Sequence, residues 1–458
     1  MLGAAALVPA GLGPAAASIA MEKELGEEFS LQARQQLPLS DDYEINRMVT
    51  DIGDALVEAV GHQPFDYEFA VVADDSINAF AVPGGKIYVH AGLISRVSSE
   101  DALAGVLAHE IAHVHAHHAI RQQQKSAAGN YAALAGVFLS MINPILGQAA
   151  MAAGLGQNLK YQRDFEREAD FLGLDYVRDA GFDPSAMLGL LRVIYDEQKL
   201  NPTNVPPYFL SHPLTGERMA NMESKLRSLE WNLPPAVMSR RLERAATIAR
   251  AMSQTREQAV PVYERRLSRA DEISRPAELE LIGLLMLHGE EYVMAEKYLS
   301  EAEKLGRSVD RELGRALLRR GKYEAARSRL IRAVASDDED WNALEDLGEL
   351  DYLQGDFQHA IERLESSFKM FPWRPQAART LARALDRVGK RERGFFYLAT
   401  ASDLEAKKLQ ALSYYKQSLP GLEENGEERA KAANRIRALE KDTAPSRGAP
   451  RRPPVPGR

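Results

Sequence analysis

Residues 107–120 read LAHEIAHVHAHHAI and place five of the chain's ten histidines within ten positions. Apolar residues recur through this segment at helical spacing, so we expect a helix over 101–120. On such a helix His109 and His113 stack one turn apart, where two imidazoles can bind one Zn²⁺. Glu110 lies beside them, directed toward the remaining coordination position, where it can serve as general base and then as general acid.

The HExxH pattern also arises by chance on solvated helices, so a third ligand is needed to support a metal site. The stretch YQRDFEREAD at 161–170 offers one. Glu166 and Asp170 are four residues apart and share a helical face, so Glu166 can bind the metal while Asp170 accepts a hydrogen bond from an imidazole. Glu168 points elsewhere on this reading. The alternative is an ordinary charged helix face.

A third motif, SHPLTGERM, begins at Ser211 after the Pro-rich stretch NPTNVPPYF. Its candidate functional residues are His212 and Arg218. The alternative reading of His212 is a solvated loop histidine without function.

Composition narrows the kind of protein. The chain has 458 residues, 45% hydrophobic and 27% charged, with a net charge of -8, which indicates a globular protein of two or three domains and does not favour nucleic acid as a partner. It contains no cysteine, so any metal must be held by His, Asp or Glu.

Two uncharged segments raise the question of export and membrane contact. Residues 1–20 are small to apolar and end in Ser-Ile-Ala, which predicts a signal peptide, possibly truncated because the basic start is missing. No charged residue occurs between Lys125 and Lys160, but Asn143-Pro144 divides this stretch into two pieces too short to span a bilayer. We expect two short apolar helices, 131–142 and 145–155, forming either core or a flap in peripheral contact with substrate or membrane; the division argues against an integral-membrane protein.

The C-terminal half carries a repeat. GKYEAA, GDFQHA and GKRERG begin at Gly321, Gly355 and Gly389, at successive intervals of 34 residues, which is the tetratricopeptide period. GEEYVMA at Gly289 resembles the same unit at an imperfect spacing of 32. Small residues recur in step where paired helices must approach closely: Ala326, Ala360 and Gly394. We expect about four repeats stacked into an α-solenoid with a concave binding surface.

These features predict a division into five segments. They are a signal peptide (1–20), a metallopeptidase domain (21–235), a helical linker (236–275), a tetratricopeptide domain (276–440) and a disordered basic tail (441–458).

The order of NAFAVPGGKIYVHAGL, HEIAHVHAHH, RDFEREAD and SHPLTGER, followed by repeats, resembles the HtpX-like gluzincin metallopeptidases, and among them the BepA-type periplasmic proteases. The resemblance covers about residues 40 to 230 through motifs and the repeats through period only. It implies one Zn²⁺ per chain and matches residues to the family's site as follows: His109, His113 and Glu166 bind zinc, Asp170 and His118 support the ligands, and His212 and Arg218 correspond to the family's loop histidine and arginine. His115 and His117 match nothing in the family.

Two roles remain open for His212. It can occupy zinc's open position and hold the resting enzyme latent, or it or Arg218 can stabilise the oxyanion.

The first of the four motifs also predicts the substrate-binding element. Asn78, Ala79 and Phe80 precede the alternating run Lys86–His90, typical of a half-exposed strand, with Gly84-Gly85 as the turn. An edge strand here could pair with an extended substrate backbone. A plain structural hairpin is the alternative.

We therefore expect a mainly α zinc endopeptidase with a small β element and a repeat solenoid. The resemblance implies a periplasmic enzyme that degrades misfolded or stalled outer-membrane proteins and assists their assembly, with the solenoid docking the β-barrel assembly machinery or the client. The alternative is a chaperone or adaptor that acts through the solenoid with little proteolysis.

Overall fold

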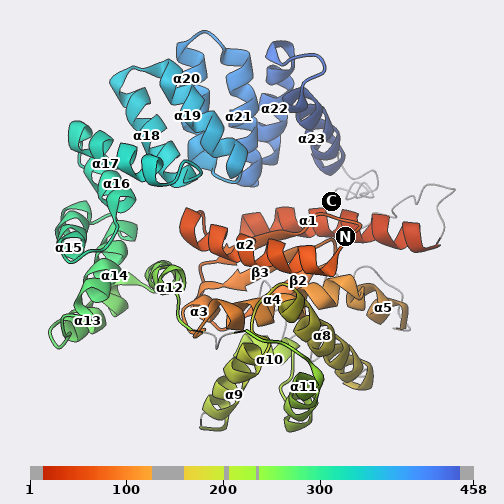
Figure 1. Cartoon of the computed structure of the whole chain (residues 1–458). Helices are drawn as coiled ribbons and strands as arrows, with labels where there is room; N and C mark the ends of the chain where they lie inside the picture. Colours follow the sequence, from red (N-terminus) through yellow and green to blue (C-terminus); the bar gives the residue numbers. More distant parts are fainter. Residues whose placement is uncertain (1–13, 126–158, 201–205, 234–236, 444–458) are drawn as a thin grey trace, which may run out of the picture. The chain divides into compact units, whose positions relative to one another are not determined.

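The computed structural model describes residues 14–125, 159–200, 206–233 and 237–443 (Figure 1). The chain divides into two compact units, Met1–Lys322 and Tyr323–Arg458. Unit 1 contains, in chain order, α1 (Pro14–Gln36), α2 (Tyr43–Val60), β1 (Glu68–Val72), β2 (Ala79–Val82), β3 (Lys86–His90), α3 (Ala91–Ile94), α4 (Glu100–His115), α5 (His118–Lys125), α8 (Leu159–Asp179), α9 (Ser185–Leu200), α10 (Pro207–Ser211), α11 (Gly216–Ser228), α12 (Arg240–Ser253), α13 (Arg256–Leu267), α14 (Arg275–His288), α15 (Tyr292–Lys304) and α16 (Asp310–Arg319).

Unit 2 is helical in its described part. It contains α17 (Tyr323–Ser336), α18 (Trp341–Gln354), α19 (Phe357–Met370), α20 (Pro375–Arg387), α21 (Arg391–Leu404), α22 (Lys408–Ser418), the 3₁₀ turn η2 (Leu419–Gly421) and α23 (Glu427–Thr443). The predicted mainly α fold with a small sheet is confirmed.

The sheet has the order β1-β3-β2, with β3 parallel to β1 and antiparallel to β2. Alternate side chains of β3 face opposite sides: Ile87 and Val89 join the core that includes α2 and α4, while Tyr88 packs with Phe29 and Ala33 of α1. The prediction of a half-exposed edge strand over Lys86–His90 is therefore wrong. All five residues are buried, because β1 and β2 flank the strand and α1 covers its second face.

The turn between β2 and β3 uses Gly84 and Gly85, as predicted, with φ of 80° and 82°. Only glycine adopts this left-handed backbone without steric cost. A Cβ on Gly84 would also lie 2.9 Å from the carbonyl oxygen of Glu22 on α1, so the glycine lets the N-terminal helix approach the turn. The contact between α1 and this turn therefore helps to fix the position of β2, which lies at one edge of the sheet.

Helix α4 carries the HExxH and lies in the middle of the core. Ser99 caps its N-terminus by accepting a hydrogen bond from the Ala102 amide at 3.1 Å. Two glycines bring its neighbours close: Gly105 faces Met187 of α9, and Gly173 of α8 faces the backbone of His109. This packing places α8 against the histidine-bearing face of α4.

The predicted linker segment forms α12 and α13, and α12 packs against α2, α3 and α14. Arg244 of α12 forms ion pairs at 2.7 Å with Glu44 of α2 and with Glu312 of α16, and it also pairs with Glu280 of α14. Since Glu280 and Glu312 are buried, these charges fasten α14 and α16 to α12 and α2. The boundary between the two compact units follows Lys322, so the first repeat-like helices, α14 to α16, belong to unit 1.

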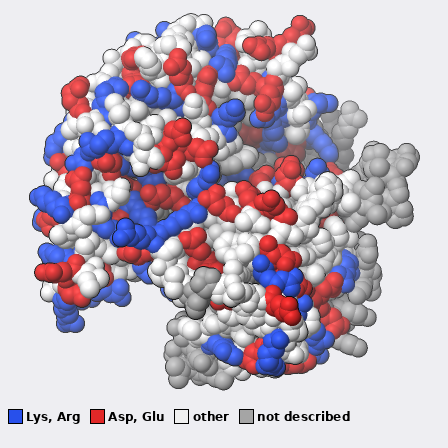
Figure 2. All heavy atoms as spheres, in the orientation of Figure 1, with Lys and Arg blue, Asp and Glu red and all other residues white. Residues whose placement is uncertain are grey.

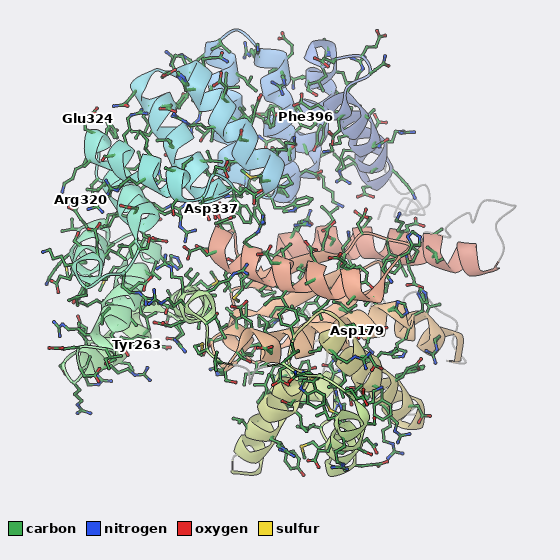
Figure 3. The ribbon with its side chains drawn as sticks, viewed as in Figure 1. Asp179, Tyr263, Arg320, Glu324, Asp337 and Phe396 are labelled. Atoms are coloured by element: carbon green, nitrogen blue, oxygen red, sulfur yellow. The ribbon has the colours of Figure 1, made fainter. Side chains whose placement is uncertain are left out.

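The repeat pattern is confirmed as helical hairpins. Gly355 and Gly389 have φ of 85° and 79° and end the first helices of the pairs α18–α19 and α20–α21, and Gly321, with φ of 72°, follows α16. In unit 2, a Cβ on Gly348 of α18 would lie 2.8 Å from the Leu364 side chain of α19, which shows how closely paired helices pack. At GEEYVMA the left-handed residue is Glu290, with φ of 61°, one position after the glycine that aligns with the repeat. Phe396 of α21 lies in the core of unit 2 (Figure 3).

Several predicted segments lie outside the described residues: the apolar helices at 131–142 and 145–155, the first part of the signal segment, and the tail beyond Thr443, where α23 ends. Among the described helices, none combines the length and apolarity needed to cross a membrane. On the face shown in Figure 2, basic and acidic side chains are interspersed.

Candidate metal centre

Helix α4 presents two imidazoles on one face, as its spacing predicted. His109 is fully buried and the His113 side chain is 15% exposed. Their Nε2 atoms lie 3.0 Å apart, so both rings direct the same nitrogen toward one point. Two facing lone pairs at this distance repel each other unless a proton or a metal ion lies between them.

Helix α8 adds two carboxylates opposite this pair. Glu166 lies 3.4 Å from the Nε2 atoms of both His109 and His113. Asp170, one turn later, has Oδ1 3.0 Å from His109 Nδ1, the nitrogen that faces away from the cluster. The structure thus brings together the residues that the two motifs predicted, with Glu166 among the inward donors and Asp170 behind His109.

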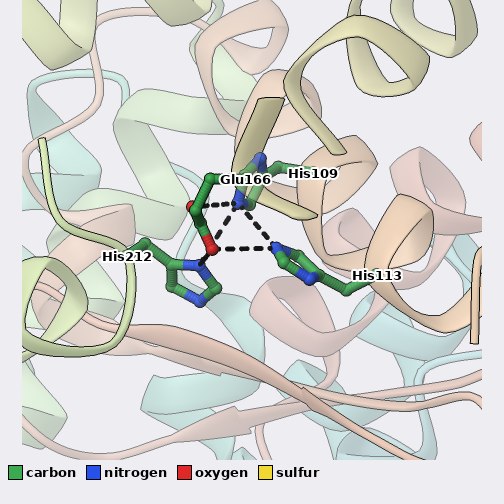
Figure 4. A group of neighbouring side chains, drawn as sticks. All are labelled: His109, His113, Glu166 and His212. Carbon is green, nitrogen blue, oxygen red and sulfur yellow. Dashed lines mark hydrogen bonds and ion pairs between the residues drawn. The ribbon is translucent and has the colours of Figure 1, made fainter. Parts of the chain in front are cut away.

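His212 follows the short helix α10 and is 7% exposed. Its Nδ1 lies 2.9 Å from Glu166 Oε1 and 3.3 Å from His109 Nε2. His109, His113, Glu166 and His212 each direct one donor atom into a group whose members all lie within 4.8 Å of one another (Figure 4). The loop histidine is therefore part of the cluster and is not solvated.

The donor set fits zinc in chemistry and spacing. Three imidazole nitrogens and one carboxylate oxygen are typical zinc ligands, and donors bound at ~2.0–2.1 Å in a tetrahedron lie about 3.3 Å apart. Four donor pairs in the cluster lie 2.9–3.4 Å apart. We find no other such group of histidine and acidic side chains within the described ranges.

The electrostatics of the pocket decide which imidazoles are neutral and ready to bind a metal ion. Burial lowers the pKa of His113 to about 3. Burial acts in the same direction on His109, but its hydrogen bonds to Asp170 and Glu166 outweigh that effect and raise its pKa to about 9. The metal-free pocket therefore holds a proton on His109, which a metal ion must displace because only the neutral imidazole is a ligand.

Glu110 lies between the cluster and the sheet and is 1% exposed. Its Oε2 accepts a hydrogen bond at 3.1 Å from the backbone amide of Ala81 on β2. Its Oε1 lies 3.5 Å from His212 Nε2. Burial raises the pKa of Glu110, the direction that suits a carboxylate which must take up a proton.

Arg218, at the start of α11, is buried against the same carboxylates. Its Nε and Nη2 donate to Asp170 at 2.7 and 2.8 Å, and its Nη1 lies 2.9 Å from Glu166. Although burial opposes ionisation, His212 and Arg218 hold the pKa of Glu166 well below its usual range. These contacts support a role in holding both carboxylates, while its predicted role at the oxyanion stays a prediction.

The side chains of the predicted substrate segment are buried, so it has mainly backbone groups to offer a substrate. Ala79 and Phe80 are buried, and the Phe80 ring stacks on Tyr88 at 5.1 Å between ring centroids. The Asn78 carbonyl accepts a hydrogen bond from the His90 amide at 3.0 Å. The role of these residues toward a substrate stays a prediction.

The other histidines of the opening stretch have separate partners. His118 Nδ1 lies 2.9 Å from His113 Nδ1, which agrees with its expected place behind the ligands. His117 Nδ1 pairs with Glu22 of α1 at 2.8 Å, and His115 Nδ1 contacts Gln63 at 3.2 Å. His115 and His117 therefore bind neighbouring elements and do not join the cluster.

Sequence reasoning missed two groups at this site. One is the backbone amide of Ala81, whose hydrogen bond to Glu110 cannot be predicted from side-chain types. The other is Tyr208, which is 2% exposed and has its ring 5.0 Å from that of His212. The sequence feature that could have identified Tyr208 is its position one helical turn before His212.

Comparison with known proteins gives a family match for the region that contains the cluster. Residues 44–226 match the model of Peptidase family M48. A relative from Vibrio cholerae is 30% identical over 304 residues, which are 63% of this chain and 62% of the relative. The beta-barrel assembly-enhancing protease of Escherichia coli strain K12 is 32% identical over 220 residues, 46% of this chain and 45% of that protein. The chain thus spans less than two thirds of these relatives.

More distant similarities include the mitochondrial metalloendopeptidase OMA1 of Schizosaccharomyces pombe, 32% identical over 187 residues, 40% of this chain and 52% of that protein. Among solved structures, MamA is 22% identical with a TM-score of 0.29 and covers 34% of this chain and 91% of its own. The family match includes every residue of the cluster in Figure 4. Residues 44–226 of this chain are a Peptidase family M48 domain.

Proposed function

We propose that the chain is a zinc endopeptidase whose active site is the cluster of His109, His113 and Glu166 beside Glu110. The observation that carries the proposal is the set of converging donors with zinc-like spacing next to a buried carboxylate. Bound zinc would polarise the scissile carbonyl and lower the pKa of its water toward ~7.

Glu110 is the general base and then the general acid. Its Oε2 is held by the Ala81 amide, and its Oε1 has no hydrogen-bond partner in the described part of the chain. The free oxygen is therefore available to take a proton from the attacking water and later deliver it to the leaving amine. Its raised pKa, caused by burial, favours that uptake.

The terminal strand β2 supports a substrate that binds in extended form. Strand β2 pairs with β3 on one side, and the Ala81 amide on its other side points to Glu110. A peptide that lies along this edge, which pairs with no further strand among the described residues, would place its backbone beside Glu110 and the donor cluster. Main-chain pairing of this kind recognises unfolded chains with little regard to sequence.

His212 is proposed as a latch on the resting site. Three protein ligands plus water make a catalytic zinc site, while four protein ligands close it. His212 Nδ1 already lies within ligand spacing of Glu166 and His109, which supports closure. Displacement of the loop by a client would open the position that water needs.

The latch is tested by His212→Ala at equal zinc occupancy with an unfolded protein as substrate. Faster hydrolysis than the parent supports the latch. Slower hydrolysis supports a role in stabilising the transition state instead, and an unchanged rate rejects both roles.

The cellular role rests on the relatives. A beta-barrel assembly-enhancing protease among them supports a periplasmic enzyme that degrades misfolded outer-membrane proteins and assists their assembly. The helical hairpins of unit 2 supply a surface on which a client or the assembly machinery can dock. The alternative, a chaperone or adaptor that acts through the solenoid with little proteolysis, gives the inward-facing donors little to do.

The direct test is Glu110→Gln. This variant should bind zinc like the parent, because Glu110 is not among the donors, and it should lose casein hydrolysis by about 10²–10⁴-fold. Asp164→Ala, on the exposed surface of α8, is the matched control and should keep full activity. Full hydrolysis by Glu110→Gln would refute the proposed mechanism.

A further inference from the structure

The acidic motif on α8 contains a third carboxylate, Glu168, that the zinc site described above does not use. It lies two residues from both Glu166 and Asp170, so it is rotated by about 200° from each around the helix. Its Oε2 lies 3.3 Å from His118 Nε2. Arg121 Nη1 lies 3.1 Å from its Oε1 and 3.0 Å from its Oε2 and holds the carboxylate in place.

His118 is held tightly between this carboxylate and a candidate metal ligand. Its side chain is 4% exposed, and its ring stacks on Phe165 with centroids 4.5 Å apart and an interplanar angle of 24°. On an unbroken helix it would face about 140° away from His113. Helix α4 instead ends at His115, and His117, with φ of 52°, turns the chain so that His118 comes back beside His113.

The donors and acceptors along this row permit one arrangement of protons. His113 directs Nε2 into the metal cluster, so its proton must be on Nδ1 for Nε2 to offer a lone pair. His113 Nδ1 then donates to His118 Nδ1 at 2.9 Å, which requires the His118 proton to be on Nε2. Glu168, a carboxylate that only accepts, fixes that proton on Nε2.

We propose that Glu168 is a positioning residue for the metal site, which acts through His118 to hold His113 in the tautomer and orientation that bind zinc. This inference rests on the zinc site of the proposed function and not on proteolysis. The stretch from Glu166 to Asp170 then uses each of its three carboxylates: Glu166 binds the metal, Asp170 holds His109 directly at 3.0 Å, and Glu168 holds His113 through one intervening ring. The sequence predicted no involvement of Glu168.

The test is the zinc affinity of the full chain, measured by competition with a chelator of known affinity at neutral pH. Glu168→Ala should weaken zinc binding by about 10-fold, the low end for groups that support a ligand, because it acts through a second ring. Glu168→Gln keeps an oxygen acceptor and should recover most of the loss. Asp164→Ala, on the same helix with its side chain 53% exposed, should match the parent.

A double-mutant cycle separates positioning from a general structural effect. In a His118→Ala background the row is already broken, so Glu168→Ala should cause no further loss of zinc affinity. An equal further loss there, or unchanged affinity of Glu168→Ala in the parent, would overturn the inference. If the alanine variant does not fold, Glu168→Met keeps the side chain's length and replaces it in both comparisons.

The outcome for the parent distinguishes this inference from the proposed function. A parent that binds no zinc would overturn both. A parent that binds zinc tightly, with Glu168→Ala equal to it, overturns the positioning role alone.

Discussion

Removing the Arg218 guanidinium should strongly destabilise the metal-free peptidase unit. The side chain is 6% exposed and holds two buried carboxylates: Asp170 through Nε and Nη2 at 2.7 and 2.8 Å, and Glu166 through Nη1 at 2.9 Å. Removing one partner of a buried ion pair leaves an uncompensated charge, which costs about 3–5 kcal/mol. We therefore expect Arg218→Ala to lower the free energy of unfolding by about this amount.

The control is a nearby exposed pair. Arg167 on α8 lies 3.2 Å from Glu217, with side chains 46% and 68% exposed. Exposed pairs contribute about 0–1 kcal/mol, so Arg167→Ala should change stability little. Arg218→Lys, which keeps the charge but not the planar fork, should fall between the two.

Zinc should reduce the effect of Arg218→Ala. A bound divalent cation would neutralise Glu166 in place of the guanidinium, so the loss of stability should be smaller in the zinc-loaded chain. The assay is guanidinium-induced unfolding followed by the fluorescence of Trp231, in a parent whose other two tryptophans, Trp341 and Trp373, are phenylalanine. A loss below about 1 kcal/mol in the metal-free chain, or a larger loss with zinc, would refute the reasoning.

Three further predictions concern packing and charge in unit 1. Burial opposes ionisation of Glu312, but the neighbouring arginines lower its pKa to about 2, so its contribution is present above pH 4.5 and is lost as the pH falls from 4.5 to 2. Unfolding free energies of Glu312→Gln and the parent should therefore differ by about 3 kcal/mol more at neutral pH than at pH 2; a pH-independent difference contradicts this. Gly105→Ala should cost about 1–3 kcal/mol in denaturant unfolding, because the added Cβ collides with Met187, and equal stability would show that the helices can separate. Residues 1–322 should fold and cleave a short peptide, whereas residues 1–275 should fold poorly because they lack the acids that neutralise a buried arginine; equal circular-dichroism melting curves would contradict this.

Local periodicity let the sequence alone predict several features. His109 and His113 lie on one helical face because the spacing of four matches one turn. The interval of 34 residues predicted the hairpins, and the three glycines at that interval adopt the left-handed backbone. Glu166 and Asp170 followed from the same helical rule. Each of these inferences depends on a pattern within one helix or on one that repeats along the chain.

Features that involve distant segments depended on the tertiary structure. Strand Lys86–His90 alternates like a half-exposed strand, and only the packing of α1 shows that both faces are buried. The resemblance placed His118 behind the ligands, but on the continuous helix expected over 101–120 it would face away from His113, and only the turn at His117 brings the two rings together.

In the sequence Arg244 looks like an ordinary surface charge, and Arg218 is marked only by its motif, without any indication of its partners. In the structure Arg218 is buried and Arg244 is partly buried, each among carboxylates that lie far away along the chain: Glu166 and Asp170 for Arg218, and Glu44, Glu280 and Glu312 for Arg244. Sequence periodicity reports which residues share an element. Which elements meet, and therefore which charges are neutralised and which imidazole nitrogen stays free for a metal, is decided by packing between segments whose separation leaves no local pattern.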